Sequence, residues 1–300
     1  MESNMESNME KNNTIHRQLK TRQLMQVINA QSAHDGDGVK ISRIAGQAYH
    51  QLLNPFLMID EINSDDAVDY IGGFPSHPHR GFETITYMKA GRMRHKDHLG
   101  NDGLISSGDV QWMTAGKGVI HSEMPEQENG LLHGFQLWLN LPANEKMKPA
   151  AYRELKQSSL PRLVLSGGGE IVAVAGNVIV LNKKGELKSI HGPLPQMTTN
   201  PVFLDLKLIP NETTTLELNV NNNAWVYVYE GSTTQLKHKQ LGYYASGDIL
   251  TLTASSQGMS ALILSGEGIN EPVVQYGPFV MNSREEINQA IDDYQNNCLV

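Results

Sequence analysis

Short runs of β-branched and aromatic residues, separated by glycine, asparagine and aspartate, recur along this 300-residue chain. Clear examples lie at residues 84–88, 110–113, 135–139, 202–208, 224–229 and 261–264. Because short strands at turn-separated intervals pack as sandwiches or barrels, the pattern predicts an all-β fold. The best helical pattern comes near the end, at about residues 283–296, where Asn282 or Ser283 can cap a helix with Ile287, Ala290, Ile291 and Tyr294 on one face.

A polar stretch at residues 146–162 separates two β-rich halves and is interpreted as a linker. We therefore expect one domain at residues 19–145 and a second at residues 163–300, which ends in the helix. Residues 1–18 are expected to form a disordered tail. A glycine and a Ser-Gly-Asp sequence occur at similar spacing in the two halves, which indicates an internal repeat of one barrel fold.

Charge and composition exclude several classes of function. The formal net charge of -8 gives the chain no general attraction for nucleic acid or anionic lipid. No apolar run approaches the roughly 20 residues of a membrane span, and the first residues resemble no secretory or transit peptide. With Cys298 as the only cysteine, no disulfide or thiolate cluster can form within the chain. These features predict a cytoplasmic protein, and also a nuclear one if the source is eukaryotic.

Six of the eleven histidines lie between His77 and His133. His77 and His79 are two residues apart, and His121 and Glu123 repeat that spacing. On a strand, residues i and i+2 point to the same face. If the two strands are neighbours, three imidazoles and one carboxylate converge inside a barrel. Such a set suits one divalent first-row metal ion, and on ligand type alone iron, manganese, nickel, copper and zinc all fit.

Other polar residues have weaker claims to this site. Glu83 shares the strand parity of His79 and is a further candidate, either as a ligand or as a partner of Arg80. His95 and His98 flank a segment interpreted as a turn, which makes a site role the less favoured interpretation. The remaining histidines have no motif context: His16, His34, His50, His191 and His238.

Two longer motifs surround the paired residues. Residues 73–84, Gly-Phe-Pro-Ser-His-Pro-His-Arg-Gly-Phe-Glu-Thr, resemble the first cupin motif as it occurs in the pirin family, and residues 108–125 resemble that family's second motif. Residues 134–142 and 277–282 also match, so the resemblance spans about residues 20–295. It implies a bicupin, with two β-barrels of which only the N-terminal one holds a metal ion. Consistently, His238 is the only histidine between Val202 and Gly268.

The resemblance also implies a ligand set. Pirins are similar in binding iron, as Fe(2+), through the positions that fall on His77, His79, His121 and Glu123, whereas the general cupin pattern would use Glu83. The candidates for holding the imidazoles in place are Glu83, Gln111, His133 and Gln136. Three further side chains could form an apolar wall for a flat aromatic substrate: Phe74, Met113 and Met124.

Several pirins act as quercetin 2,3-dioxygenases, which implies that this chain opens a flavonol-like substrate with dioxygen and releases carbon monoxide. Glu123 would be the catalytic base. A rival interpretation is an iron-dependent regulatory protein without turnover, which binds a protein partner as transcription co-regulator or modulator of a metabolic enzyme. A third is a cupin enzyme with another small substrate, because one barrel and one metal ion host many chemistries.

Overall fold

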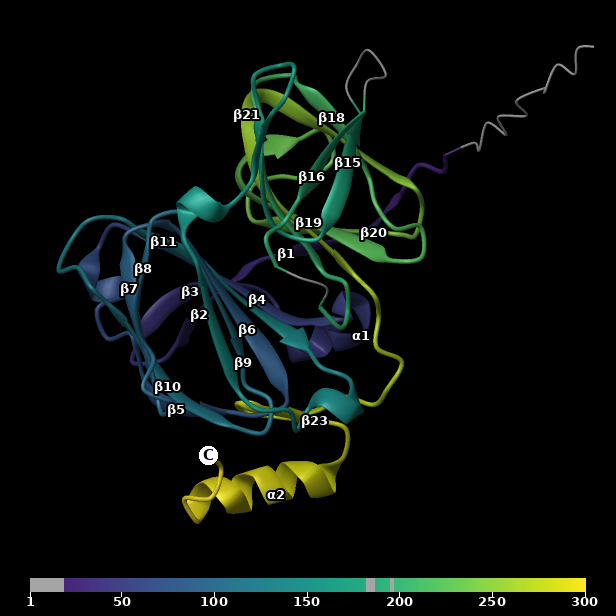
Figure 1. Ribbon diagram of the computed structural model, residues 1–300. Helices are drawn as coiled ribbons and strands as arrows, with labels where there is room; N and C mark the ends of the chain where they lie inside the picture. The colour runs from purple at the N-terminus through teal and green to yellow at the C-terminus, as the bar shows by residue number, and fades with distance from the viewer. Residues whose placement is uncertain (1–18, 182–186, 195–196) are drawn as a thin grey trace, which may run out of the picture.

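The structure is a computed structural model that describes residues 19–181, 187–194 and 197–300. Two β-barrels lie next to one another, and strands make up most of the described chain (Figure 1). This confirms the predicted all-β architecture with a short C-terminal helix. The predicted disordered tail at residues 1–18 lies outside the described residues.

The N-terminal barrel consists of a seven-stranded and a four-stranded sheet. The larger sheet has the order β12-β9-β6-β11-β4-β3-β2, with bounds, in chain order, of Gln31–Asp35 (β2), Val39–Ala45 (β3), Phe56–Ser64 (β4), Phe82–Ala90 (β6), Val110–Thr114 (β9), Leu132–Asn140 (β11) and Ala151–Leu155 (β12). The smaller sheet has the order β5-β10-β7-β8, with bounds of Phe74–His79 (β5), Arg92–Asp97 (β7), Asp102–Ser106 (β8) and Val119–Pro125 (β10). Short helical turns connect the strands: Gln47–Tyr49 (η1), His50–Leu53 (α1), Ala67–Asp69 (η2), Ala143–Glu145 (η3) and Gln157–Ser159 (η4).

The C-terminal barrel is a single ten-stranded sheet. Its main path runs β1-β20-β19-β21-β17-β14-β13, and β21 also pairs with β18, which leads to β15 and β16. The bounds are Leu24–Asn29 (β1), Arg162–Val164 (β13), Glu170–Ala175 (β14), Asn177–Leu181 (β15), Leu187–His191 (β16), Val202–Leu208 (β17), Thr213–Glu217 (β18), Asn223–Thr233 (β19), Gln240–Tyr244 (β20) and Ile249–Gly266 (β21). A separate hairpin joins Val274–Tyr276 (β22) to Phe279–Met281 (β23), and α2 follows at Arg284–Gln295.

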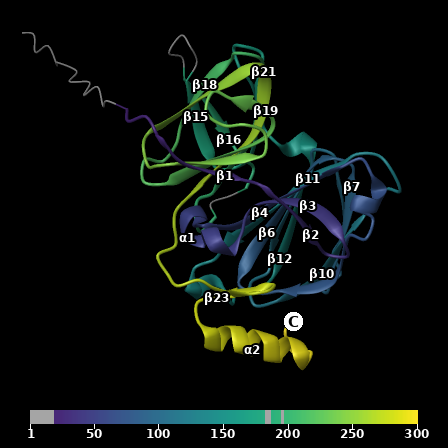
Figure 2. The same ribbon diagram turned by 180° about the vertical axis from the view of Figure 1, so that it is seen from behind.

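The two ends of the chain are exchanged between the barrels (Figures 1 and 2). β1 pairs with β20, so the start of the domain expected at residues 19–145 belongs to the C-terminal barrel. Conversely, β23 and α2 lie against the N-terminal barrel, where Arg80 donates to Asp293 at 2.6 Å. The last part of the domain expected at residues 163–300 therefore packs against the other barrel. Sequence composition could not show this exchange, because it depends on which strand each end meets.

The linker expected at residues 146–162 contains a strand of the N-terminal barrel. β12 pairs with β9 from Ala151 opposite Thr114 to Leu155 opposite Val110. β12 lies at the edge of its sheet and none of its residues is fully buried. Edge strands tolerate charged side chains, which discourage further pairing, so this strand has the composition of a linker.

The C-terminal helix forms as the sequence indicates. Ser283 caps it through a reciprocal pair of hydrogen bonds with Glu286, and Ile287 and Ala290 are buried. Among the described residues, no helix reaches the length and apolarity that are needed to cross a bilayer.

Alternation along β6 divides its side chains between two environments. Ile85 and Tyr87 point toward the C-terminal barrel and share a buried cluster with Phe203 and Trp225 of that barrel. Thr86 points the opposite way, into the N-terminal barrel, where it contacts Glu123. The interface between the barrels is therefore a continuous hydrophobic core, which holds the two barrels together as one unit.

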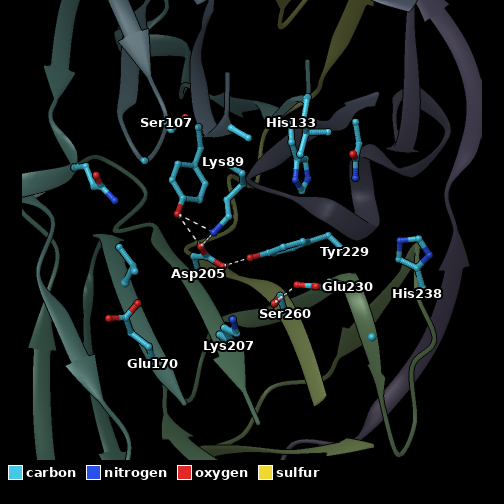
Figure 3. Close-up of a pocket in the computed structure, with 18 of the residues that line it drawn as sticks. Lys89, Ser107, His133, Glu170, Asp205, Lys207, Tyr229, Glu230, His238 and Ser260 are labelled. Atoms are coloured by element: carbon cyan, nitrogen blue, oxygen red, sulfur yellow. Dashed lines mark hydrogen bonds and ion pairs between the residues drawn. The ribbon is translucent and has the colours of Figure 1, made fainter. Parts of the chain in front are cut away.

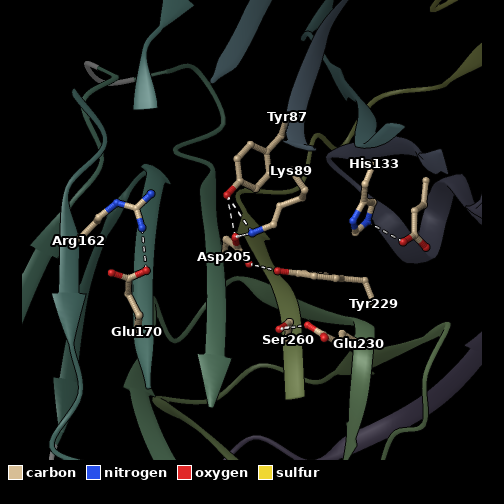
Figure 4. A network of polar contacts seen from close by, with 10 residues as sticks. Tyr87, Lys89, His133, Arg162, Glu170, Asp205, Tyr229, Glu230 and Ser260 are labelled. Carbon is tan, nitrogen blue, oxygen red and sulfur yellow. Dashed lines mark hydrogen bonds and ion pairs between the residues drawn. The ribbon is translucent and has the colours of Figure 1, made fainter. Parts of the chain in front are cut away.

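Two buried hydrogen bonds cross this interface in opposite directions. Tyr87 of the N-terminal barrel donates to Asp205 at 2.7 Å, and Tyr227 of the C-terminal barrel donates to Glu61 at 2.5 Å. Lys89 also pairs with Asp205, which Figure 4 shows beside Tyr87. Because each buried carboxylate receives several donors, the network favours one fixed arrangement of the barrels.

A cleft of about 910 Å³ opens beside these bonds, between the barrels (Figure 3). Its buried polar groups are already paired: Asp205 also accepts from Tyr229, and Ser260 donates to Glu230. Among the described residues, no buried side-chain atom without a partner lines this cleft. The hydrogen bonds within the network therefore explain why these polar groups are buried, and the network has a structural role in connecting the barrels.

Candidate metal centre

Two neighbouring strands of the smaller sheet carry the paired residues. β5 holds His77 and His79, and β10 holds His121 and Glu123. These strands are antiparallel, with His121 directly opposite His77. Ring nitrogens of the three histidines lie within 4.8 Å of one another. The pairing of β5 with β10 thus brings together side chains that are distant in the sequence.

The rings of His77 and His79 have a geometry that suits a cation. Their Nε2 atoms lie 3.1 Å apart. The Nδ1 atoms face carbonyl oxygens instead, at 2.8 Å from Pro75 and 3.4 Å from Pro278. Because Nδ1 must carry the proton to donate, both Nε2 atoms present lone pairs. Two metal–nitrogen bonds of about 2.1 Å at a right angle would separate the nitrogens by about 3.0 Å, which matches.

The third ring, His121, presents a lone pair to the same place. Its Nε2 is buried and has no hydrogen-bond partner among the described residues. Its Nδ1 lies 3.3 Å from Nδ1 of His95, whose Nε2 lies 3.3 Å from Asp97. If His95 donates to Asp97, it accepts from His121, and Nε2 of His121 is left unprotonated. Carboxylate–histidine pairs behind a metal ligand fix its tautomer and orientation in this way.

Burial keeps two rings of the cluster, those of His79 and His121, uncharged. It lowers the pKa of His79 well below the usual value, and the neighbouring His77 lowers it further. Burial likewise lowers the pKa of His121 well below the usual value. Neutral imidazoles are the form that binds metals. The rings of His79 and His121 therefore offer lone pairs rather than positive charge at neutral pH.

Glu123 approaches the cluster from the side of His121. It is buried, and its carboxylate forms a second group with His121 and His95, again within 4.8 Å. Thr86 donates to Oε1 of Glu123 at 2.9 Å. The pairing with β5 shifts register here, because the two steps from His121 to Glu123 face three steps from His77 to Phe74, so the extra residue lies on β5.

Gln111 and Gln136 support Glu123 through Thr86. Their side-chain oxygens lie 3.0 and 2.8 Å from the Thr86 hydroxyl. The Thr86 hydroxyl has a single proton, which it donates to Glu123. The two amide groups can therefore bond to Thr86 only if they are flipped, so that their nitrogens donate to the hydroxyl oxygen. For Gln111 this turn also gives a partner to an Nε2 that otherwise has none. Both glutamines therefore lie near the cluster, but they contact Thr86 rather than an imidazole.

Glu83 and His133, the other two candidates, do not reach the cluster. Glu83 accepts from Trp112 at 3.1 Å and Thr114 at 2.7 Å, on the outer face of its sheet. Gly81, with a φ of +92°, interrupts the chain between β5 and β6, so the parity of His79 does not extend to Glu83. His133 instead contacts Glu61 at 2.9 Å and lines the cleft between the barrels (Figure 3). Of the four candidates, these two therefore contact none of the three imidazoles.

His95 is the residue that the sequence interpretation undervalued. It lies on strand β7 rather than in a turn, and its side chain is fully buried. Along this strand, Met93 and His95 are buried while their neighbours are partly or fully exposed, a period of two that the sequence Arg-Met-Arg-His-Lys already displays. His98, by contrast, lies at the surface and accepts from the backbone of Ile120 at 3.3 Å.

The cluster opens into a cavity of about 780 Å³, which is within the usual range for small-molecule sites. Its apolar lining consists of Ile41, Met58, Ile62, Phe74 and Trp138. The exchanged C-terminal segment adds Gln275, Gly277 and Pro278. Of the three side chains expected to form an apolar wall, Phe74 lines the cavity, whereas Met113 and Met124 do not.

Comparison with known proteins shows similarity in both sequence and fold. The family model described as Pirin matches residues 38–139, and the model described as Pirin C-terminal cupin domain matches residues 203–299. A Pseudomonas aeruginosa protein named "Putative quercetin 2,3-dioxygenase" is 44% identical over 285 residues, which cover 93% of this chain and 98% of that protein. A Vibrio cholerae protein of the same description is 45% identical over 279 residues, covering 92% and 96%. A crystal structure of quercetin 2,3-dioxygenase from Acinetobacter baumannii superposes with a TM-score of 0.83 at 31% identity, covering 93% of this chain and 98% of that one.

Proposed function

Because this chain belongs to the pirin family, we propose that it is a metal-dependent dioxygenase that opens the heterocycle of flavonols such as quercetin. The observation that carries the proposal is the convergence of three unprotonated ring nitrogens, from His77, His79 and His121, beside a cavity with an apolar wall. A cluster of buried lone pairs is unfavourable without a cation between them. The substrate is taken from the names of the relatives and from the size and lining of the cavity.

The ligands in this proposal are His77, His79, His121 and Glu123, and the ion is Fe(2+). Imidazole nitrogens suit several first-row metals, but histidines combined with a carboxylate and open positions are typical of non-haem iron oxygenases. Glu123 would join the three rings on the side of His121, where its carboxylate already lies near that ring.

When bound, such an ion supplies Lewis acidity toward a phenolic oxygen and redox chemistry with dioxygen. The protein contributes the base. Oε1 of Glu123 is held by Thr86, so its other oxygen can accept the proton of the flavonol 3-hydroxyl. General-base catalysis of this kind accelerates reactions by typically about 10²–10⁴-fold.

The apolar wall positions the substrate and excludes water. Met58, Phe74 and Trp138 line the cavity and offer apolar contacts to a flat ring system. Trp138 also packs edge-on against the ring of His79, with centroids 5.3 Å apart. A dry, shaped site keeps a reactive, deprotonated substrate from side reactions with solvent.

The test is turnover by protein loaded with iron under anaerobic conditions and then mixed with quercetin and oxygen. We expect oxygen uptake with release of carbon monoxide in equal amounts. Replacing Glu123 with glutamine should lower the rate by at least about 100-fold, since the base is lost. Protein that binds iron fully yet consumes no oxygen with any flavonol would favour the rival interpretation, a regulatory protein without turnover.

A further inference from the structure

A row of polar side chains crosses the inner face of the seven-stranded sheet. The strand registers place Thr86 opposite Gln136, Gln136 opposite Asp60, and Asp60 opposite Arg43. Paired residues on neighbouring antiparallel strands share a face, and such strands lie about 4.8 Å apart. The row therefore extends about 14 Å, from Thr86 beside Glu123 to Arg43 at the far end of the cavity.

The far end of the row is a partly buried ion pair. Arg43 donates from Nε to Asp60 at 2.9 Å and from Nη2 to Asp60 at 2.7 Å. Nη2 also donates to Asp35 at 2.7 Å. Burial raises the pKa of Asp60 to about 6 although Arg43 acts to lower it, so the carboxylate is ionised at neutral pH. Nη1 of Arg43 has no partner among the described residues, and Arg43, Asp60 and Asp35 all line the cavity.

The charges of the cavity favour a neutral ligand with hydroxyl groups. Of the residues that the structure describes, Arg43 is the only lysine or arginine that lines it, against four carboxylates: Asp35, Asp37, Asp60 and Glu123. An excess of negative charge disfavours anionic ligands, because like charges repel in a partly buried site. A phenolic hydroxyl is neutral, can donate to Asp60, and can accept from Nη1 of Arg43. The pair therefore offers both the acceptor and the donor that a bound hydroxyl group needs.

We propose that Arg43 and Asp60 form a specificity site that binds ring hydroxyl groups at the end of the substrate remote from His77, His79 and His121. The inference rests on the proposed function and narrows its substrate class to neutral polyhydroxylated aromatics. A site built to hydrogen-bond a hydroxyl discriminates strongly against an analogue that lacks it, because its own polar groups then stay unpaired. Arg43 and Asp60 select the substrate and touch none of the reacting atoms.

The test compares two flavonols that differ in ring hydroxyls. Quercetin carries them on both outer ring systems, and 3-hydroxyflavone carries none, although both keep the reacting 3-hydroxyl. Dissociation constants are measured by fluorescence titration of the metal-loaded protein without oxygen, so that binding is recorded apart from turnover. The variants are Arg43→Gln and Asp60→Asn. Arg162→Gln, which removes an exposed arginine from the ion pair with Glu170 in the other cleft, is the matched control.

We expect the wild-type protein and Arg162→Gln to bind quercetin at least about tenfold more tightly than 3-hydroxyflavone, as one hydrogen bond to a charged group implies. In Arg43→Gln and Asp60→Asn this preference should fall about tenfold, mainly through weaker binding of quercetin. Circular dichroism and metal content verify that each variant is folded and loaded. If Asp60→Asn does not fold, Arg43→Gln decides the test, because the arginine is the more exposed partner.

Two other results have distinct meanings. If the wild-type protein binds flavonols but both variants keep its preference, the specificity site is refuted while the proposed function stands. If the wild-type protein binds no flavonol at all, the proposed function fails, and the specificity site fails with it.

Discussion

Nδ1 of His95 lies 3.3 Å from Nδ1 of His121, and both rings are buried. Their relationship fixes which nitrogen of His121 faces His77 and His79. Asp97 determines which ring nitrogens carry protons, because His95 donates to Asp97 and accepts from His121. Burial acts to raise the pKa of Asp97, but hydrogen bonds, above all from Asn101, lower it below the usual value. The carboxylate is therefore ionised at neutral pH and accepts from His95.

Replacing His95 with phenylalanine should weaken metal binding by about 10–100-fold, the usual effect of losing a residue that orients a ligand. The ring volume is kept, so the fold should persist. Chelator competition measures the affinity, and His98→Phe, at an exposed histidine on the same segment, is the control. Equal affinities in the wild type and His95→Phe would show that His121 needs no support from His95.

His79→Ala should abolish stoichiometric metal binding while the protein stays folded. His79 supplies one of three converging nitrogens, but it belongs to none of the large hydrophobic clusters that hold the barrels together. Elemental analysis reports the metal content, and circular dichroism reports the fold. His133→Ala is the matched control, since its ring faces the other cleft. A full metal load in His79→Ala would overturn the ligand assignment.

Glu83→Gln should lower stability without changing the metal content. Glu83 is buried and accepts hydrogen bonds from Trp112 and Thr114. An amide has only one acceptor oxygen, so one donor would lose its partner at a cost of about 1–3 kcal/mol. Urea unfolding of the metal-free protein measures the loss, and metal titration measures the site. Reduced metal binding in this variant, with the fold intact, would return Glu83 to the list of ligands.

Lys146 should make stability increase with pH. Its buried ammonium donates to Gly81, Val280 and Asn140, and burial lowers its pKa from 10.5 to about 7. Between these values the unfolded chain holds a proton that the folded protein has released, so raising the pH favours the folded state. The free energy of unfolding should rise by about 1.4 kcal/mol per pH unit within this window.

Lys146→Met should remove this slope. Urea unfolding at pH 7.5 and pH 9 compares the variant with the wild-type protein, and the difference in slope is the measured quantity. The variant's absolute stability is a separate matter, because methionine leaves the carbonyl acceptors unpaired. Parallel pH profiles for the two proteins would mean that Lys146 remains charged throughout.

The strands, the C-terminal helix and the two donor pairs could be predicted from the sequence, because each is a local pattern. The i, i+2 spacing of His77 with His79 places both on one face of any strand that contains them. The same holds for His121 with Glu123. The capping serine and the glutamate three residues later likewise indicate where α2 begins. Local periodicity needs no knowledge of distant residues.

Only the tertiary structure decided which segments meet. The pairing of β5 with β10 brought His77 opposite His121, and the pairing of β10 with β7 placed His95 behind it. The turn at Gly81 separated Glu83 from the cluster, and the exchange of chain ends gave the cavity Pro278. Strand partners and register are set by the burial of whole faces against distant residues, a quantity that no local pattern contains.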